Sequence, residues 1–123
     1  MVNQSIQTQY PAQIIGAGPG DPELITVRGQ KLLAQADVIF YTGSLVPEQM
    51  LQHCLPTATF VDTRSHTLES WLPQMQEYVQ QGKRVVRLQD GDPCLYGALH
   101  ELMAFLLTHQ IAFEIVPGVS AFQ

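Results

Sequence analysis

The chain has 123 residues, 46% of them hydrophobic, and carries a formal net charge of −5 with only six lysines and arginines. This length and apolar content suit one globular domain, and so few basic residues argue against a nucleic-acid partner. No apolar run approaches the roughly 18 to 20 residues of a membrane span, and the polar residues 1–9 lack the features of a signal peptide. We therefore expect a cytoplasmic protein with no membrane partner. Cys54 and Cys94 are too few for a disulfide framework, so both are expected to be reduced.

Short apolar or β-branched runs alternate along the chain with segments of helical period. The runs that predict strands are residues 14–15, 38–41, 59–61, 84–88 and 113–116. Five strands separated by crossover helices predict an α/β fold, a three-layer sandwich with a five-stranded, mainly parallel sheet. We assign residues 11–123 to this single domain and residues 1–10 to a flexible N-terminus.

Four helices are expected between these strands. The first should begin at Asp21, because an acid followed by Pro22 and Glu23 is a strong helix-start signal. Apolar residues at helical spacing predict two more helices, one over 68–79 that ends at Gly82 and one over 95–106. A shorter helix is expected from Pro47 to Leu55.

Three turns rich in glycine and proline each follow a predicted strand, at residues 16–22, 91–97 and 117–121. In open α/β sheets, small ligands bind in the crevice outside the carboxyl ends of the strands. The three turns therefore predict one composite pocket for a small molecule. The first turn does not fit a dinucleotide fingerprint, because Asp21 stands where the third glycine belongs, and good helix capping alone is an alternative explanation for it.

The second turn has a polar cluster that strand packing does not require. Asp90, Asp92 and Tyr96 surround Gly91. Carboxylates accept hydrogen bonds from ribose hydroxyls or from a ligand ammonium, and glycine lets a ligand approach the main chain. A tight turn alone would explain Gly91 and Pro93, but not the coincidence with two other turns of this kind.

Two segments resemble the signatures of the tetrapyrrole methylase family, whose members use S-adenosylmethionine. These are residues 15–29, at the first turn, and residues 85–97, at the second. Within the family, residues 36–46 are most similar to the branch that methylates C11 of precorrin-4 or cobalt-precorrin-4 in cobalamin synthesis. The resemblance implies that seven residues lie near the S-adenosylmethionine cofactor: Pro19, Asp90, Gly91, Asp92, Leu95, Ser120 and Ala121.

The tetrapyrrole substrate implied by this resemblance is a polyanion, so local cations should bind it. Our candidate substrate contacts are Arg28, Thr42, Ser44, Arg64 and Tyr96. Thr42 departs from the uroporphyrinogen III methyltransferases, which resemble the chain closely but carry an acid there. That branch is one alternative, and a non-catalytic binding or scaffold protein is another. We assign no catalytic residue and no metal ligand, because the four histidines lack metal-ligand spacing.

Family members have a second domain of similar size after the segment that resembles residues 117–120. Since this chain stops there, we expect an N-terminal half whose C-terminal domain is missing. Such a half should fold but lack activity by itself, and a homodimer is expected.

Overall fold

All neighbouring strands of the sheet are parallel, in the order β3-β2-β4-β1-β5. The computed structural model describes residues 10–16, 25–42, 54–89 and 98–117. Its strands are β1 (Ala12–Gly16), β2 (Val38–Tyr41), β3 (Thr59–Asp62), β4 (Val85–Gln89) and β5 (Phe113–Val116). Its helices are α1 (Val27–Leu33), α2 (Leu68–Gln80) and α3 (Ala98–Thr108), with a 3-10 turn η3 (Thr63–Ser65) after β3. The predicted five-stranded parallel sheet is confirmed.

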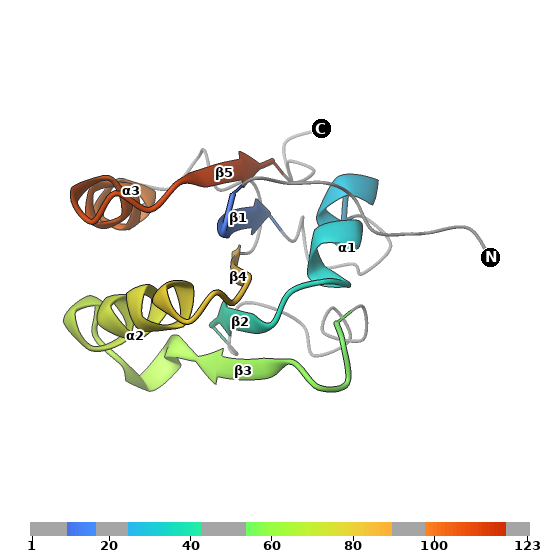
Figure 1. The fold of residues 1–123 in the computed structure, drawn as a ribbon, viewed down its shortest axis with the longest axis horizontal. Helices are drawn as coiled ribbons and strands as arrows, with labels where there is room; N and C mark the ends of the chain where they lie inside the picture. Colours follow the sequence, from blue (N-terminus) through green and yellow to red (C-terminus); the bar gives the residue numbers. More distant parts are fainter. Residues whose placement is uncertain (1–9, 17–24, 43–53, 90–97, 118–123) are drawn as a thin grey trace.

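Helices cover both faces of this sheet, with α2 and α3 on one side and α1 on the other (Figure 1). The strand β4 lies between β2 and β1, so it occupies the middle of the sheet. At its third residue, Arg87 is in register with Phe40 of β2 and with Ile14 of β1. The three-layer sandwich expected from the sequence is therefore the architecture that the structure has.

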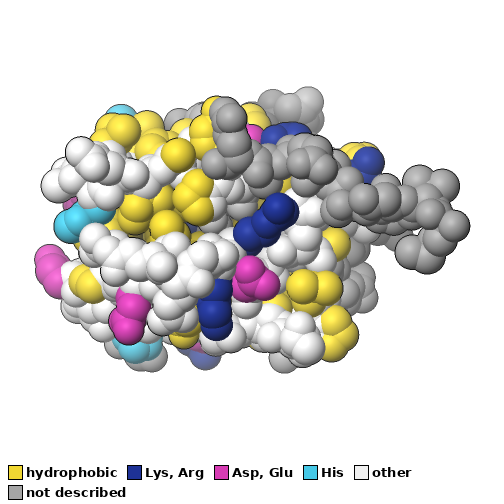
Figure 2. All heavy atoms as spheres, viewed as in Figure 1, with side chains coloured by type: hydrophobic (Ala, Val, Ile, Leu, Met, Phe, Trp, Pro, Cys, Tyr) yellow, Lys and Arg dark blue, Asp and Glu magenta, His cyan; other side chains and the backbone are white. Residues whose placement is uncertain are grey.

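Two apolar clusters fill the spaces between the layers. Strands covered on both faces have apolar residues at consecutive positions instead of strict alternation, as in Val38, Ile39 and Phe40, which are all fully buried. Hydrophobic side chains also gather between α2 and α3 on the face shown in Figure 2. The cluster under α2 and α3 includes Ala12, Ile14, Val38, Phe40, Trp71, Met75, Val85, Leu102 and Leu106. The cluster under α1 includes Ile15, Leu32, Leu33, Ile39, Val86 and Leu88.

The first helix begins later than the sequence predicted. Ile25 and Thr26 are not helical, and α1 begins at Val27 with Thr26 as its N-cap. The Thr26 hydroxyl accepts a hydrogen bond from the backbone N–H of Gly29 at 3.1 Å, which satisfies a donor that the first turn leaves unpaired. The prediction that this helix begins at Asp21 is therefore wrong for α1. Asp21 itself lies outside the described residues.

The other helices match their predictions more closely. Helix α2 begins at the expected residue and ends one residue later than predicted, at Gln80. Gly82 follows it with φ of 82°, a conformation that favours glycine. The described part of helix α3 starts at Ala98, and the expected start at Leu95 lies outside the described residues. Most of the helix expected from Pro47 to Leu55 also lies outside them, and its last two residues, Cys54 and Leu55, are not helical. No helix in the described ranges is long and apolar enough to cross a membrane.

Gly29 allows α1 to lie close to β1. A Cβ atom at this position would meet Cγ2 of Ile15 at 3.0 Å and Oγ1 of Thr26 at 3.1 Å. Ile15 is fully buried in the cluster under α1, and Thr26 holds the cap, so both neighbours would have to shift by a few tenths of an ångström. Glycine is therefore favoured here by packing.

We predict that Gly29→Ala lowers the free energy of unfolding. Alanine is favoured over glycine inside a helix by about 1 kcal/mol, but overpacking a core contact costs about 1–3 kcal/mol, so the net loss should be about 1 kcal/mol. Urea denaturation of the chain measures it, with Lys31→Ala at an exposed position of α1 as the control. A variant more stable than the wild type would show that α1 does not need this close approach.

Candidate functional site

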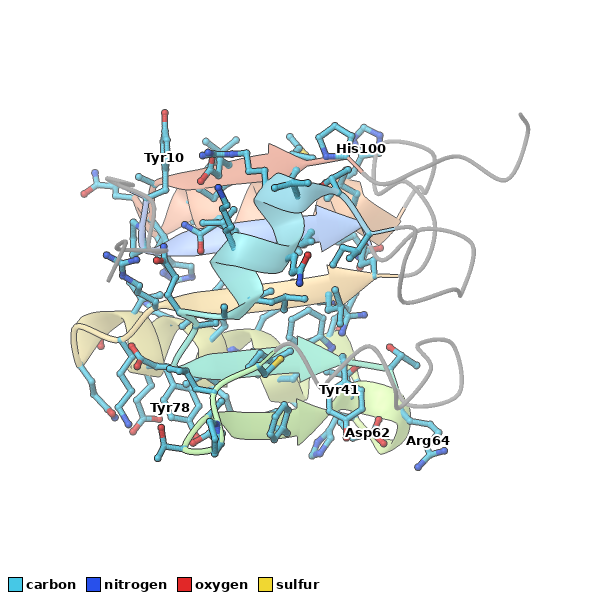
Figure 3. All side chains as sticks on the ribbon, turned by 90° about the vertical axis from the view of Figure 1, so that its right-hand side faces the viewer. Tyr10, Tyr41, Asp62, Arg64, Tyr78 and His100 are labelled. Atoms are coloured by element: carbon cyan, nitrogen blue, oxygen red, sulfur yellow. The ribbon has the colours of Figure 1, made fainter. Side chains whose placement is uncertain are left out.

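The carboxyl ends of the parallel strands share one edge of the sheet. Figure 3 shows Tyr41, Asp62 and Arg64 at that edge, and Tyr10 and Tyr78 at the opposite one. The turns that the sequence predicts to bind a ligand follow β1, β4 and β5 directly, so their attachment points lie at this edge. Nine of the predicted site residues lie outside the described residues: Pro19, Ser44, Asp90, Gly91, Asp92, Leu95, Tyr96, Ser120 and Ala121. Their roles stay predictions.

At this edge, an arginine inside the central strand holds the ends of two other strands. Nη1 of Arg87 donates to Oγ1 of Thr63 at 3.0 Å, and Nη2 donates to Oγ1 of Thr42 at 3.2 Å. The two threonine hydroxyls are 3.0 Å apart, and that of Thr63 also donates to the Tyr41 carbonyl at 3.2 Å. Since a hydroxyl has one proton, Thr42 is the donor to Thr63. We call Arg87, Thr42 and Thr63 the Arg87 cluster.

The guanidinium of Arg87 is charged and largely removed from water. Its carbon Cζ lies 4.8 Å from the centre of the Trp71 ring on α2, in a cation–π contact. Burial lowers the pKa of Arg87 to about 10, which still leaves the group positively charged at neutral pH. The ion pairs among the described residues join Arg28 to Glu114 and Arg64 to Asp62, and neither includes Arg87.

Two polar atoms at the end of β4 are out of water and have no hydrogen-bond partner among the residues that the structure describes. They are Nε of Arg87, a donor, and Oε1 of Gln89, an acceptor. These residues are two positions apart on one strand and thus lie on the same face of the sheet. Leaving such a group unpaired costs about 1–3 kcal/mol. An unpaired donor and an unpaired acceptor at the ligand-binding edge of an α/β sheet therefore fit a polar ligand.

The structure brings one of the five candidate substrate contacts into this cluster, namely Thr42. Arg64 lies on η3 just beyond β3, with 61% of its side chain exposed, and pairs with Asp62 at 3.1 Å. Arg28 pairs with Glu114 of β5 at 2.7 Å. Because Arg28 belongs to α1, it lies across the sheet from the face that Arg87 and Trp71 occupy.

The described histidines and cysteine have ordinary local environments. Nδ1 of His66 is 3.1 Å from the Ser70 hydroxyl, and His109 contacts Gln76 and the ring of Phe105. Among the residues that the structure describes, no three His, Cys, Asp or Glu side chains are grouped to hold a metal ion. Cys54 is a free thiol, and burial raises its pKa to about 11, which makes it unreactive at neutral pH.

The sequence analysis missed Arg87, Thr63, Trp71 and Gln89 as site residues. It treated residues 84–88 only as a strand. One signal was available in the sequence: Arg87 lies between Val86 and Leu88. A charged side chain inside an otherwise apolar central strand is costly to bury, which indicates a specific role for it.

The profile of the tetrapyrrole (corrin/porphyrin) methylases matches residues 13–123. Over 108 residues, the chain is 48% identical to the cobalt-precorrin-4 C(11)-methyltransferase of Methanocaldococcus jannaschii, and the match covers 88% of this chain and 42% of that protein. It is 49% identical over 108 residues to the precorrin-4 C(11)-methyltransferase of Mycobacterium tuberculosis, covering 88% of this chain and 43% of the relative.

Solved structures give the same result. A cobalt precorrin-4 methyltransferase matches with a TM-score of 0.86 and 46% identity, over 89% of this chain and 46% of that one. A uroporphyrin-III C-methyl transferase from Thermus thermophilus, in complex with S-adenosylhomocysteine, matches with a TM-score of 0.76 and 36% identity, over 89% of this chain and 45% of that one. The chain therefore belongs to the tetrapyrrole methylases, and it spans less than half the length of these relatives.

We predict that Arg87→Met leaves the free energy of unfolding unchanged or raises it by about 1–2 kcal/mol. Methionine removes a largely buried charge that has no counter-ion among the described residues, while the two threonines keep their mutual hydrogen bond. The lowered pKa gives the sign of the pH dependence. The folded protein binds the Arg87 proton less tightly than the unfolded chain, so the cost of the charge is present below pH 10 and disappears as the pH rises above it.

Urea denaturation at neutral pH measures this effect, with Arg84→Met, just before the other end of β4, as the control. A loss of more than about 2 kcal/mol at position 87 alone would mean that Arg87 is held for stability.

Proposed function

We propose that the protein containing this chain transfers a methyl group from S-adenosylmethionine to C11 of precorrin-4 or cobalt-precorrin-4, with this chain as the N-terminal half of the enzyme. The observation that carries the proposal is the identity of 41–49% to proteins named for precorrin-4 methylation, against 29–38% to those named for uroporphyrin-III or uroporphyrinogen-III methylation. The first group also has the higher TM-score.

The end of the sheet suits a polar cofactor and an anionic substrate. Within the described ranges, Oε1 of Gln89 is a buried acceptor without a partner, and Nε of Arg87 is a buried donor without one. The solved relative in complex with S-adenosylhomocysteine supports S-adenosylmethionine as the donor. We propose that Pro19, Gly91 and the other five residues predicted from the family signatures contact it.

When bound, S-adenosylmethionine supplies a methyl group on a sulfonium that is already an activated leaving group. The ring carbon would form a bond to the methyl as the carbon–sulfur bond breaks, with the electron pair going to sulfur, and the alkylated macrocycle would then lose a proton to a base to which we assign no residue. No side chain has to act as a nucleophile. The protein must align the two molecules and exclude water, for which oriented contacts contribute several kcal/mol of barrier lowering.

We propose that a C-terminal domain, as in the relatives, completes the active site. Since this chain covers less than half of each, the remaining contacts to cofactor and substrate would come from the other half. We propose that the complete enzyme acts in the cytoplasm as a homodimer and that the 123 residues alone do not turn over.

The test uses the protein encoded by the full reading frame that contains this chain. We predict that it adds one methyl group to precorrin-4 or cobalt-precorrin-4, read by mass spectrometry after incubation with S-adenosylmethionine, and does not methylate uroporphyrinogen III efficiently. The 123-residue chain serves as the control and should give no product. Efficient double methylation of uroporphyrinogen III would assign the protein to that branch instead, and no methylation of any of the three would favour a binding or scaffold role.

A further inference from the structure

Arg87 has more hydrogen-bond donors than the described protein uses. A guanidinium has five N–H donors. Thr63 and Thr42 each accept one, and Nε is out of water with no partner among the described residues. Since the Trp71 ring lies against the guanidinium at 4.8 Å, the free donors are those in the plane of the group, at its edge. A ligand would have to meet this edge.

Within the described ranges, no carboxylate forms an ion pair with Arg87. The hydroxyls of Thr42 and Thr63 fix the orientation of the guanidinium, but as neutral groups they do not balance it. The carboxylates of Asp62 and Glu114 are paired with Arg64 and Arg28. A cation held largely away from water is stabilised by an anion with several hydrogen-bond acceptors.

The geometry of a guanidinium edge selects the kind of anion. Nε–H and a neighbouring Nη–H are parallel donors, and this fork matches the two oxygens of a carboxylate. A tetrapyrrole with acidic side chains presents such carboxylates. We propose that Arg87 binds one carboxylate of the tetrapyrrole substrate through its Nε–H edge, and that a neutral residue at position 42 is what keeps the charge of Arg87 available for it. This inference rests on the proposed function.

Thr42 is placed to control this interaction. Its Oγ1 is 3.2 Å from Nη2 of Arg87, so a carboxylate introduced at position 42 would reach the guanidinium. An internal ion pair would then satisfy Arg87 and compete with the substrate. If Arg87 serves only to hold the ends of β2 and η3 together, the same ion pair would strengthen that link without affecting substrate affinity. Thr42→Asp therefore separates the two roles.

The experiment compares four variants of the full-length protein in steady-state methylation: Thr42→Asp, Thr42→Asn, Arg87→Gln and Arg84→Gln. Thr42→Asp and Arg87→Gln should raise the KM for the tetrapyrrole about tenfold or more, the range expected for losing a charged hydrogen bond, with little change in the KM for S-adenosylmethionine. Thr42→Asn, which is neutral, should raise it less than Thr42→Asp. Arg84→Gln removes an arginine near the other end of β4 and should match the wild type.

A binding measurement keeps this inference distinct from the proposed function. Isothermal titration with uroporphyrin III, a tetrapyrrole with carboxylate side chains, requires no turnover. Wild-type protein should bind it at least about tenfold more tightly than Thr42→Asp, and the methyl ester of the probe should lose that difference. If no methylation is detected but the binding difference holds, the proposed function fails and the carboxylate site stands. Equal binding by the wild type and Thr42→Asp, or no binding to either, would overturn the inference.

Discussion

The candidate site of this domain depends on one largely buried cation, Arg87, in the central strand of a parallel sheet. Strand β4 is hydrogen-bonded on both sides and covered by helices on both faces, so Val85, Val86 and Leu88 are fully buried. Arg87 interrupts this run, and its side chain connects the ends of β2, β4 and η3. The apolar layers thus place a charged group at the edge of the sheet where α/β proteins bind ligands.

The environment of Arg87 orients the group more than it stabilises the charge. Trp71 contributes a cation–π contact and two hydroxyls accept hydrogen bonds, yet burial still lowers the pKa of Arg87 to about 10. Its Nε has no partner in the part of the chain that the structure describes. Such a group costs stability in the absence of a ligand and supplies binding energy in its presence. Active sites commonly combine these two properties, because a site that satisfied all of its own polar groups would have little left for a substrate.

The sequence predicted the layers of the fold better than the contacts of the site. Strands and helices follow from local patterns, so β2 and β5 were predicted with their observed bounds. The first helix was misplaced because Asp21-Pro22-Glu23 is a stronger local signal than Thr26, while the contact of Gly29 with Ile15 depends on tertiary packing. The Arg87 cluster could not be predicted, since Thr42, Thr63 and Arg87 are 21 to 45 positions apart in sequence and meet only when three strand ends align.

The most direct test of this account observes the unused donor of Arg87 itself. In the ¹⁵N-labelled full-length protein at neutral pH, the Nε–Hε resonance of Arg87 is identified by its loss in Arg87→Lys. Adding uroporphyrin III should shift this resonance and slow its exchange with water, because a carboxylate takes the free donor. If other resonances report binding while that of Arg87 stays unchanged, the central claim that this buried cation is held for a ligand is contradicted.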